Sequence, residues 1–215
     1  MKTVAFVPIK LHSQRVPHKN ILPLGKHPLC WYIFETLPGL EGVDEVYVYC
    51  SDETIRDFIP DTVTFLKRDA RLDGDTVKGF DIYDCFIREV DADIYLLSHA
   101  TSPFVRRETV QNALNHVISG QNDSAFAAER IQNFLWTPSG PLNYDPNDVP
   151  RTQDLAPVFS ENGAFYIFRK EVFTEHRRRI GFNPYIGELD RVESIDIDEP
   201  RDFEFARMTA RILDI

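Results

Sequence analysis

Short apolar runs that alternate with amphipathic segments fill the first two thirds of the chain. The run over 3–9 is almost wholly apolar, and the run over 45–50 is β-branched and aromatic, as expected of buried strands. Shorter runs of this kind predict further strands over 63–66, 93–97 and 123–128. Apolar residues at helical spacing predict helices over 27–37, 75–90, 108–118 and 201–213. This alternation predicts an α/β fold with a mostly parallel sheet, in which ligands bind beyond the carboxyl ends of the strands.

The alternation stops over 132–155, where four prolines and one glycine interrupt a polar stretch. A loop of this length is usually functional or part of an interface. Regular structure is predicted again over 158–168, and no internal repeat is present. We therefore expect one domain over 1–215 with an excursion over 132–157.

Composition and charge exclude several classes of protein. The net charge of −10 argues against broad nucleic-acid binding, which needs a basic surface. No apolar run approaches the roughly 18–20 residues that a membrane span needs, and the N-terminus lacks the features of a signal peptide. The three cysteines are scattered and form no CxxC pair, so reduced thiols are expected. We expect a cytoplasmic protein that contacts neither membrane nor nucleic acid.

Basic residues gather directly after the first predicted strand, in the loop over 10–20. Lys10, Arg15 and Lys19 lie there with Ser13 and two histidines. Cationic, hydroxyl and backbone N–H groups at the end of a parallel strand suit a triphosphate. Neither the GxxxxGK[ST] nor the GxGxxG pattern is present. From charge alone, a solvated basic turn explains the loop equally well.

The string S-x-R-x-P-x-K-N over 13–20 resembles the signature loop of the sugar nucleotidyltransferases. More narrowly, it resembles the acylneuraminate and 3-deoxy-manno-octulosonate cytidylyltransferases. Four further blocks follow in the order of that family, over 68–76, 97–104, 151–167 and 194–203. The block over 151–167 is similar to the family pattern R-x-Q-D-L-x-P-x-x-x-E-N-G-A-x-Y-I. The resemblance implies a Rossmann-like, three-layer α/β/α nucleotide-diphospho-sugar transferase fold.

The resemblance also assigns binding roles to residues of this chain. For the nucleotide it implies Lys10, Ser13, Arg15, Lys19, Asn20, Arg68 and Thr76. For the sugar it implies His99, Thr101, Arg151, Gln153, Asn162 and Tyr166. His99 occupies the place of a glutamine in the family's L-L-Q-P-T-S-P, so a passive polar residue is an equal alternative there. Lys10 stands where the family loop usually has arginine and keeps the charge without the bidentate fork.

Two carboxylates near the C-terminus, Asp196 and Asp198, are predicted at positions i and i+2 of a strand, which share one face. Oxygen ligands suit Mg²⁺, which is usually shared with substrate phosphates. The resemblance favours Mg²⁺ as the cofactor and assigns catalysis to Asp196, Asp198 and Lys19. The alternative is a pair of solvated aspartates with Asp198 capping the last helix. No residue is singled out as a general base.

The function that the resemblance implies is transfer of CMP from CTP to an acidic sugar, such as a sialic-acid-like nonulosonic acid, with release of pyrophosphate. It also implies a homodimer in which the excursion over 132–157 serves dimerisation and the sugar site. One alternative is the same fold acting on another acceptor, such as an octulosonic acid or a non-sugar acid or phosphate. The other is a nucleotide-binding protein without catalysis.

Overall fold

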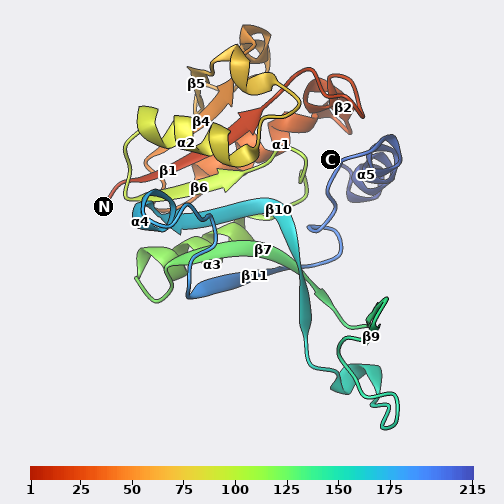
Figure 1. The fold of residues 1–215 in the computed structure, drawn as a ribbon. Helices are drawn as coiled ribbons and strands as arrows, with labels where there is room; N and C mark the ends of the chain where they lie inside the picture. Colours follow the sequence, from red (N-terminus) through yellow and green to blue (C-terminus); the bar gives the residue numbers. More distant parts are fainter.

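The computed structural model describes residues 1–215, and a seven-stranded sheet ordered β11-β7-β10-β6-β1-β4-β5 runs through it (Figure 1). Its strands are β1 (Thr3–Ile9), β4 (Glu45–Cys50), β5 (Thr64–Lys67), β6 (Ile94–Ser98), β7 (Ser124–Ile131), β10 (Val158–Arg169) and β11 (Pro184–Leu189). Paired strands are parallel except at β10, which runs antiparallel to both of its neighbours. The predicted mostly parallel sheet is confirmed.

Helices cover both faces of this sheet and complete three layers. They are α1 (Leu29–Thr36), α2 (Gly79–Glu89), α3 (Arg107–Ile118) and α4 (Lys170–Thr174). Helix α5 (Pro200–Leu213) lies to one side and packs in a separate core with Leu24 and Tyr32 (Figure 1). Short 3-10 helices are η1 (Lys19–Ile21), η2 (Leu37–Gly39), η3 (Glu53–Phe58), η4 (Ala70–Asp73) and η5 (Thr152–Asp154). Two small hairpins pair β2 (Pro23–Leu24) with β3 (His27–Pro28) and β8 (Trp136–Thr137) with β9 (Gly140–Pro141). The α/β/α layering agrees with the predicted fold.

Side chains of the central strand β1 alternate between two cores. Val7 packs with α1 and α3 on one face, whereas Phe6 packs with α2 and α4 on the other. Phe6 stacks on Phe86 of α2 with ring centroids 4.1 Å apart. Because successive side chains of a strand point to opposite faces, a wholly apolar strand is what a two-sided core requires.

Some boundaries and elements differ from the sequence predictions. Helix α2 begins at Gly79 rather than 75, because Val77 N–H closes a turn onto the Gly74 carbonyl (3.1 Å) before the helix starts. Strand β11 was not predicted, since it begins with a proline, contains a glycine and lies at the sheet edge. The segment 195–198 is extended but lies outside the sheet, so the predicted strand there is wrong.

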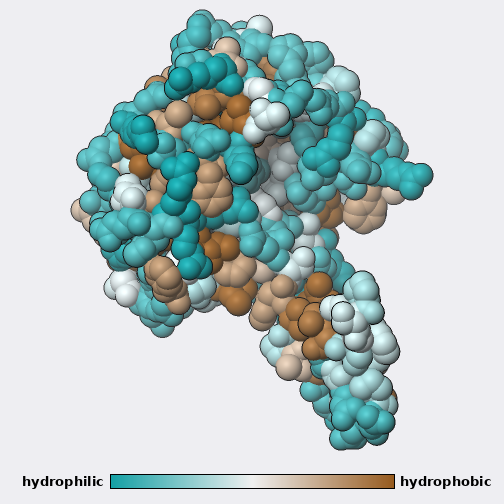
Figure 2. All heavy atoms as spheres, viewed as in Figure 1, coloured by the Kyte–Doolittle hydropathy of each residue, from teal (hydrophilic) through white to brown (hydrophobic).

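Residues 132–157 form an arm that projects from the sheet (Figure 1). It contains the β8–β9 hairpin and η5, and it exposes the apolar side chains of Phe134, Trp136, Leu142 and Val149. Apolar surface gathers on this arm in Figure 2. The excursion predicted from the prolines is therefore an ordered projection with its own unburied apolar residues. No helix of the structure has the length and apolar composition needed to cross a membrane.

Candidate functional site

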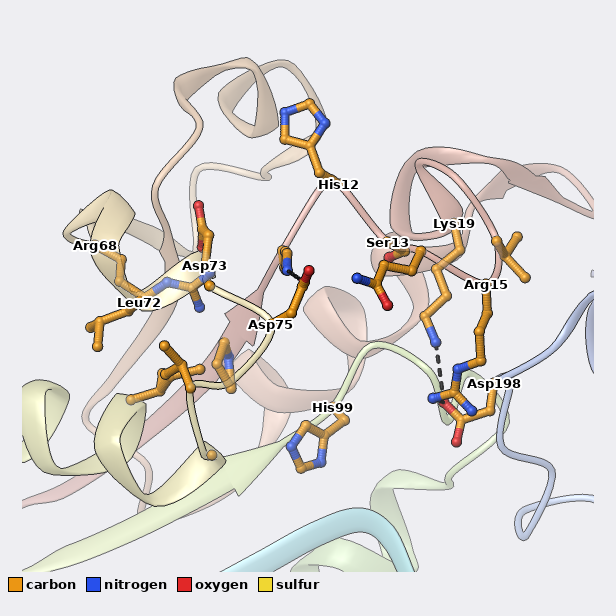
Figure 3. A pocket seen from close by; sticks show the side chains of 18 of the residues that line it. His12, Ser13, Arg15, Lys19, Arg68, Leu72, Asp73, Asp75, His99 and Asp198 are labelled. Carbon is orange, nitrogen blue, oxygen red and sulfur yellow. Dashed lines mark hydrogen bonds and ion pairs between the residues drawn. The ribbon is translucent and has the colours of Figure 1, made fainter.

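A pocket of about 420 Å³ lies at the edge of the sheet where β1, β5 and β6 end (Figure 3). Seven residues singled out in the sequence line it: Lys10, Ser13, Arg15, Lys19, Arg68, His99 and Asp198. Parallel strands deliver these residues because the chain leaves each strand at the same edge. Four of them are basic in a chain of net charge −10, so positive charge is concentrated here. Such a pocket suits an anionic ligand.

The loop after β1 is closed by internal hydrogen bonds. The Asn20 side chain is buried and donates from Nδ2 to the Lys10 carbonyl at 3.0 Å, which ties the two ends of the loop. His18 takes a left-handed conformation (φ 56°) just before η1, and Lys19 N–H donates to the Val16 carbonyl at 3.2 Å. Asn20 thus shapes the loop and is not among the residues that line the pocket, so its predicted contact with a nucleotide stays a prediction.

Carboxylates hold the pocket's basic side chains. Lys19 Nζ donates to the Ile197 carbonyl at 2.6 Å and lies 3.4 Å from Asp198 Oδ1. Arg15 reaches the same oxygen at 3.1 Å, and Lys10 Nζ lies 3.1 Å from Asp75 Oδ1. An entering polyphosphate would compete with these carboxylates for the same cations.

At the opposite end of the pocket, Arg68 is fixed from three sides (Figure 3). Its backbone N–H donates to the Cys50 carbonyl at 2.9 Å, one terminal nitrogen donates to Tyr49 O at 3.3 Å, and the other donates to Asp73. Asp73 also accepts from the Ser51 hydroxyl. The Arg68 side chain is only 1% exposed, and its Nε has no hydrogen-bond partner. The Arg68 guanidinium is therefore held in one orientation at the edge of the pocket.

Asp196 and Asp198 flank the buried Ile197, whose N–H donates to the Thr101 carbonyl at 2.9 Å. Asp198 lines the pocket, whereas Asp196 does not, and Asp196 Oδ1 is buried without a partner. Glu199 caps α5 in a reciprocal capping box with Asp202, so the alternative role of Asp198 as the helix cap is wrong. No group of three or more His, Cys, Asp and Glu side chains could hold a metal by itself. A divalent cation here would need oxygens from a ligand as well.

Two other predicted contact residues lie outside the pocket lining. Thr76 is exposed in the turn before α2, because the helix begins four residues later than the sequence suggests. Thr101 contributes its backbone carbonyl to the 195–198 segment instead of a side chain to the pocket.

Asn162 and Tyr166 act as supports beside the pocket. Asn162 Oδ1 accepts from Ala164 N–H and its Nδ2 donates to the Ser194 carbonyl, both at 2.9 Å. Tyr166 is buried and donates to Glu161 at 2.7 Å. Neither side chain lines the pocket. The amide of Asn162 and the phenol of Tyr166 are both hydrogen bonded within the protein.

Arg151 and Gln153 lie in the arm and not at the pocket. Arg151 forms a two-nitrogen pair with Asp154, at 2.6 and 3.0 Å. Gln153 lines a separate pocket with Arg130 and Arg191. Within one chain, these two predicted sugar contacts are therefore remote from the basic pocket.

The sequence analysis missed three residues that shape the pocket: Asp73, Asp75 and Tyr83. Both aspartates belong to the block over 68–76, where attention to charge pairing with Arg68 and Lys10 would have found them. Tyr83 follows the apolar spacing of α2, and nothing in that pattern distinguishes it from the core residues of the helix.

Comparison with known proteins gives a consistent result. A family model described as Cytidylyltransferase matches residues 4–211. N-acylneuraminate cytidylyltransferase of Streptococcus agalactiae is 22% identical over 94% of this chain and 52% of its own length. Pseudaminic acid cytidylyltransferase of Campylobacter jejuni is 25% identical over 99% of this chain and 97% of its own. The chain thus spans about half the length of the first of these relatives and nearly all of the second.

A solved structure shares the fold. It is a CMP:2-keto-3-deoxy-manno-octonic acid synthetase complexed with CTP, with a TM-score of 0.74 and 19% sequence identity. The match covers 99% of this chain and 100% of that chain. The likeness confirms the predicted Rossmann-like α/β fold.

The competition between carboxylates and an entering anion is testable with inorganic tripolyphosphate in the absence of divalent cations. Asp75→Asn removes the carboxylate partner of Lys10, and Asp198→Asn removes that of Arg15 and Lys19. We expect calorimetry to show that each variant binds tripolyphosphate about three- to tenfold more tightly than the parent chain. Asp61→Asn is the matched control, because Asp61 is exposed and lies outside the pocket lining. Equal affinities in all three variants and the parent chain would contradict the proposed competition.

Proposed function

Because the chain belongs to the cytidylyltransferase family, we propose that it transfers CMP from CTP to an acidic sugar and releases pyrophosphate. The observation that carries this proposal is the group of Lys10, Arg15 and Lys19 at the carboxyl edge of the sheet, where Arg15 and Lys19 pair with Asp198 and Lys10 pairs with Asp75. In the reaction a hydroxyl oxygen of the sugar bonds to the α-phosphorus of CTP. The bond to the β-phosphate breaks, and the hydroxyl proton passes to solvent. Such transfers depend chiefly on positioning and charge stabilisation.

The two ends of the pocket suggest how the nucleotide lies. The cations of the loop after β1, with the Ser13 hydroxyl, are suited to the triphosphate. The fixed guanidinium of Arg68, with Asp73 beside it, is suited to the base. This orientation directs the α-phosphate toward the Arg15–Lys19–Asp198 cluster.

Mg²⁺ is the proposed cofactor, and two features of the carboxylates fit it. Asp196 Oδ1 is a buried oxygen without a partner, and Asp198 is half exposed at the pocket. These two residues would supply oxygen ligands and the substrate phosphates the remainder, which is the usual arrangement for this ion. When bound, Mg²⁺ would neutralise charge on the phosphate oxygens.

We further propose that the protein is a homodimer in which the arm of one copy completes the sugar site of the other. The arm exposes Trp136 and Leu142 at 62% and 60%, an unusual loss of apolar burial for a segment with ordered structure. Arg151, the predicted partner of the sugar carboxylate, lies on the same arm. A second copy would bury the apolar residues and bring Arg151 to a pocket that it does not reach within its own chain.

The names of the relatives favour a nonulosonic acid as the acceptor, since N-acylneuraminic and pseudaminic acids both have nine-carbon skeletons with a carboxylate. We also propose a cytoplasmic location. The absence of paired cysteines supports it, because disulfides are rare in reducing compartments.

Pyrophosphate release tests the proposed activity directly. With Mg²⁺, we expect release only from CTP among the four nucleoside triphosphates. We also expect it only with one acid from a panel of N-acetylneuraminic, pseudaminic and 3-deoxy-manno-octulosonic acids. Asp198→Asn should be inactive, and Asp61→Asn should match the parent chain. Release from CTP without any acid, or from another nucleotide at an equal rate, would overturn the proposal.

Mixed dimers test the arm. Arg151→Ala should lower kcat/KM for the acid at least about tenfold with KM for CTP unchanged. Arg88→Ala, an equally exposed arginine in an ion pair on α2, should change neither. When Arg151→Ala and Asp198→Asn chains are co-expressed and purified as heterodimers, one of the two sites is intact, so activity should recover to about half that of the parent dimer. A heterodimer no more active than the Arg151→Ala and Asp198→Asn homodimers would exclude a shared site.

A further inference from the structure

His99 lies at the floor of the pocket, between the Arg68 end and the Arg15–Lys19 end (Figure 3). It directly follows β6, and its ring nitrogen Nδ1 lies 2.5 Å from the Gly163 carbonyl oxygen. A carbonyl oxygen can only accept a hydrogen bond, so Nδ1 must carry a proton. This contact assigns the tautomer of the ring.

The neutral form of the ring is favoured by its surroundings. Burial lowers the pKa of His99, and the positive charges of Arg179 and Lys19 lower it further, whereas the Gly163 carbonyl and Asp196 act in the opposite direction. The other groups against the ring are the phenols of Tyr83 and Tyr166, which carry no charge in neutral solution. A neutral ring with its proton on Nδ1 leaves a lone pair on Nε2.

The Nε2 lone pair accepts no short hydrogen bond from the protein. The nearest donor is the Tyr83 hydroxyl at 3.5 Å, well beyond the distance of a good hydrogen bond between such atoms. Tyr83 and His99 both line the pocket, so a ligand group can approach Nε2.

The Gly163 carbonyl is aimed at His99 by an irregularity in β10. The register of β10 against β7 shifts between Glu161 and Tyr166, as at a β-bulge. Asn162 holds this segment by accepting from Ala164 N–H and donating to the Ser194 carbonyl. The E-N-G-A string, unusual in sequence, therefore serves as a positioning device for the histidine.

We propose that His99 is a specificity-determining residue whose Nε2 accepts a hydrogen bond from a hydroxyl group of a bound substrate. This inference rests on the proposed function. A glutamine, which the related motif has at this position, offers both a donor and an acceptor, whereas His99 offers only an acceptor to the pocket. The hydroxyl has two possible sources, the acidic sugar and the ribose of CTP.

Single-hydroxyl deletions identify the source. Pyrophosphate release is measured with CTP, 2′-deoxy-CTP and 3′-deoxy-CTP, and with the accepted acid and its monodeoxy analogues. We expect the parent chain to lose at least about tenfold in kcat/KM with one of these compounds, because Nε2 is then left unpaired. In His99→Ala the same deletion should change kcat/KM less than about twofold, since no acceptor remains. Sensitivity to a sugar deletion assigns the site to the acceptor, and sensitivity to a ribose deletion assigns it to the nucleotide.

His99→Gln controls for a loss of activity caused by misfolding of His99→Ala. Its side chain occupies the space of the imidazole ring and retains a hydrogen-bond acceptor. The His99→Gln variant should still lose kcat/KM when the hydroxyl is deleted. It should also gain activity toward an analogue in which a carbonyl group replaces that hydroxyl, because glutamine supplies a donor. A thermal denaturation curve first establishes that His99→Ala is folded. The proposal is overturned if this variant discriminates against the deoxy compounds as strongly as the parent chain does. Calorimetric binding of the same compounds gives the comparison without turnover. A parent chain that binds selectively but releases no pyrophosphate would sink the proposed function and leave the role of His99 supported.

Discussion

The pocket depends on the ion pairs through which Asp198 holds Arg15 and Lys19. These pairs join the loop after the first strand to the segment before the last helix, and they bring opposite ends of the chain together. The Lys19 side chain is only 12% exposed, so its charge needs a partner whether or not a ligand is present. Carboxylates fill that role in the free protein. The cations are thereby paired in the free protein, and an entering triphosphate would replace the carboxylate oxygens with its own phosphate oxygens.

Much of the fold followed from local patterns because the central strands are buried on both faces. The bounds of β1 and β4 are those expected from their apolar runs, since no solvent-facing position interrupts them. Strand β11 escaped prediction because it is stabilised by pairing with β7 and not by its own composition. The start of α2 was misplaced because Asp75 and Thr76 suit a helix locally, whereas Val77 N–H closes a turn onto the Gly74 carbonyl and Asp75 pairs with Lys10 across the pocket.

Within the site, charge and position after a strand pointed to Lys10, Arg15 and Lys19, because the topology brings strand ends to one edge. The family resemblance singled out Asp198, although the strand predicted around it is absent. The sequence did not reveal that Asn162 holds the backbone of β10, because an amide that closes a backbone irregularity cannot be told from a ligand contact in the sequence. The arm poses a different problem. In the proposed dimer Arg151 would meet a substrate only through a second copy, and no pattern within one chain describes such a contact.

The most direct test of CMP transfer is to follow the phosphorus atoms of CTP. The parent chain is incubated with Mg²⁺, the accepted acid and CTP carrying ³²P at either the α or the γ position. If the chain transfers CMP, the α label appears on the sugar and the γ label in pyrophosphate. An α label that stays in free CMP, or a γ label that appears on the sugar, would contradict it.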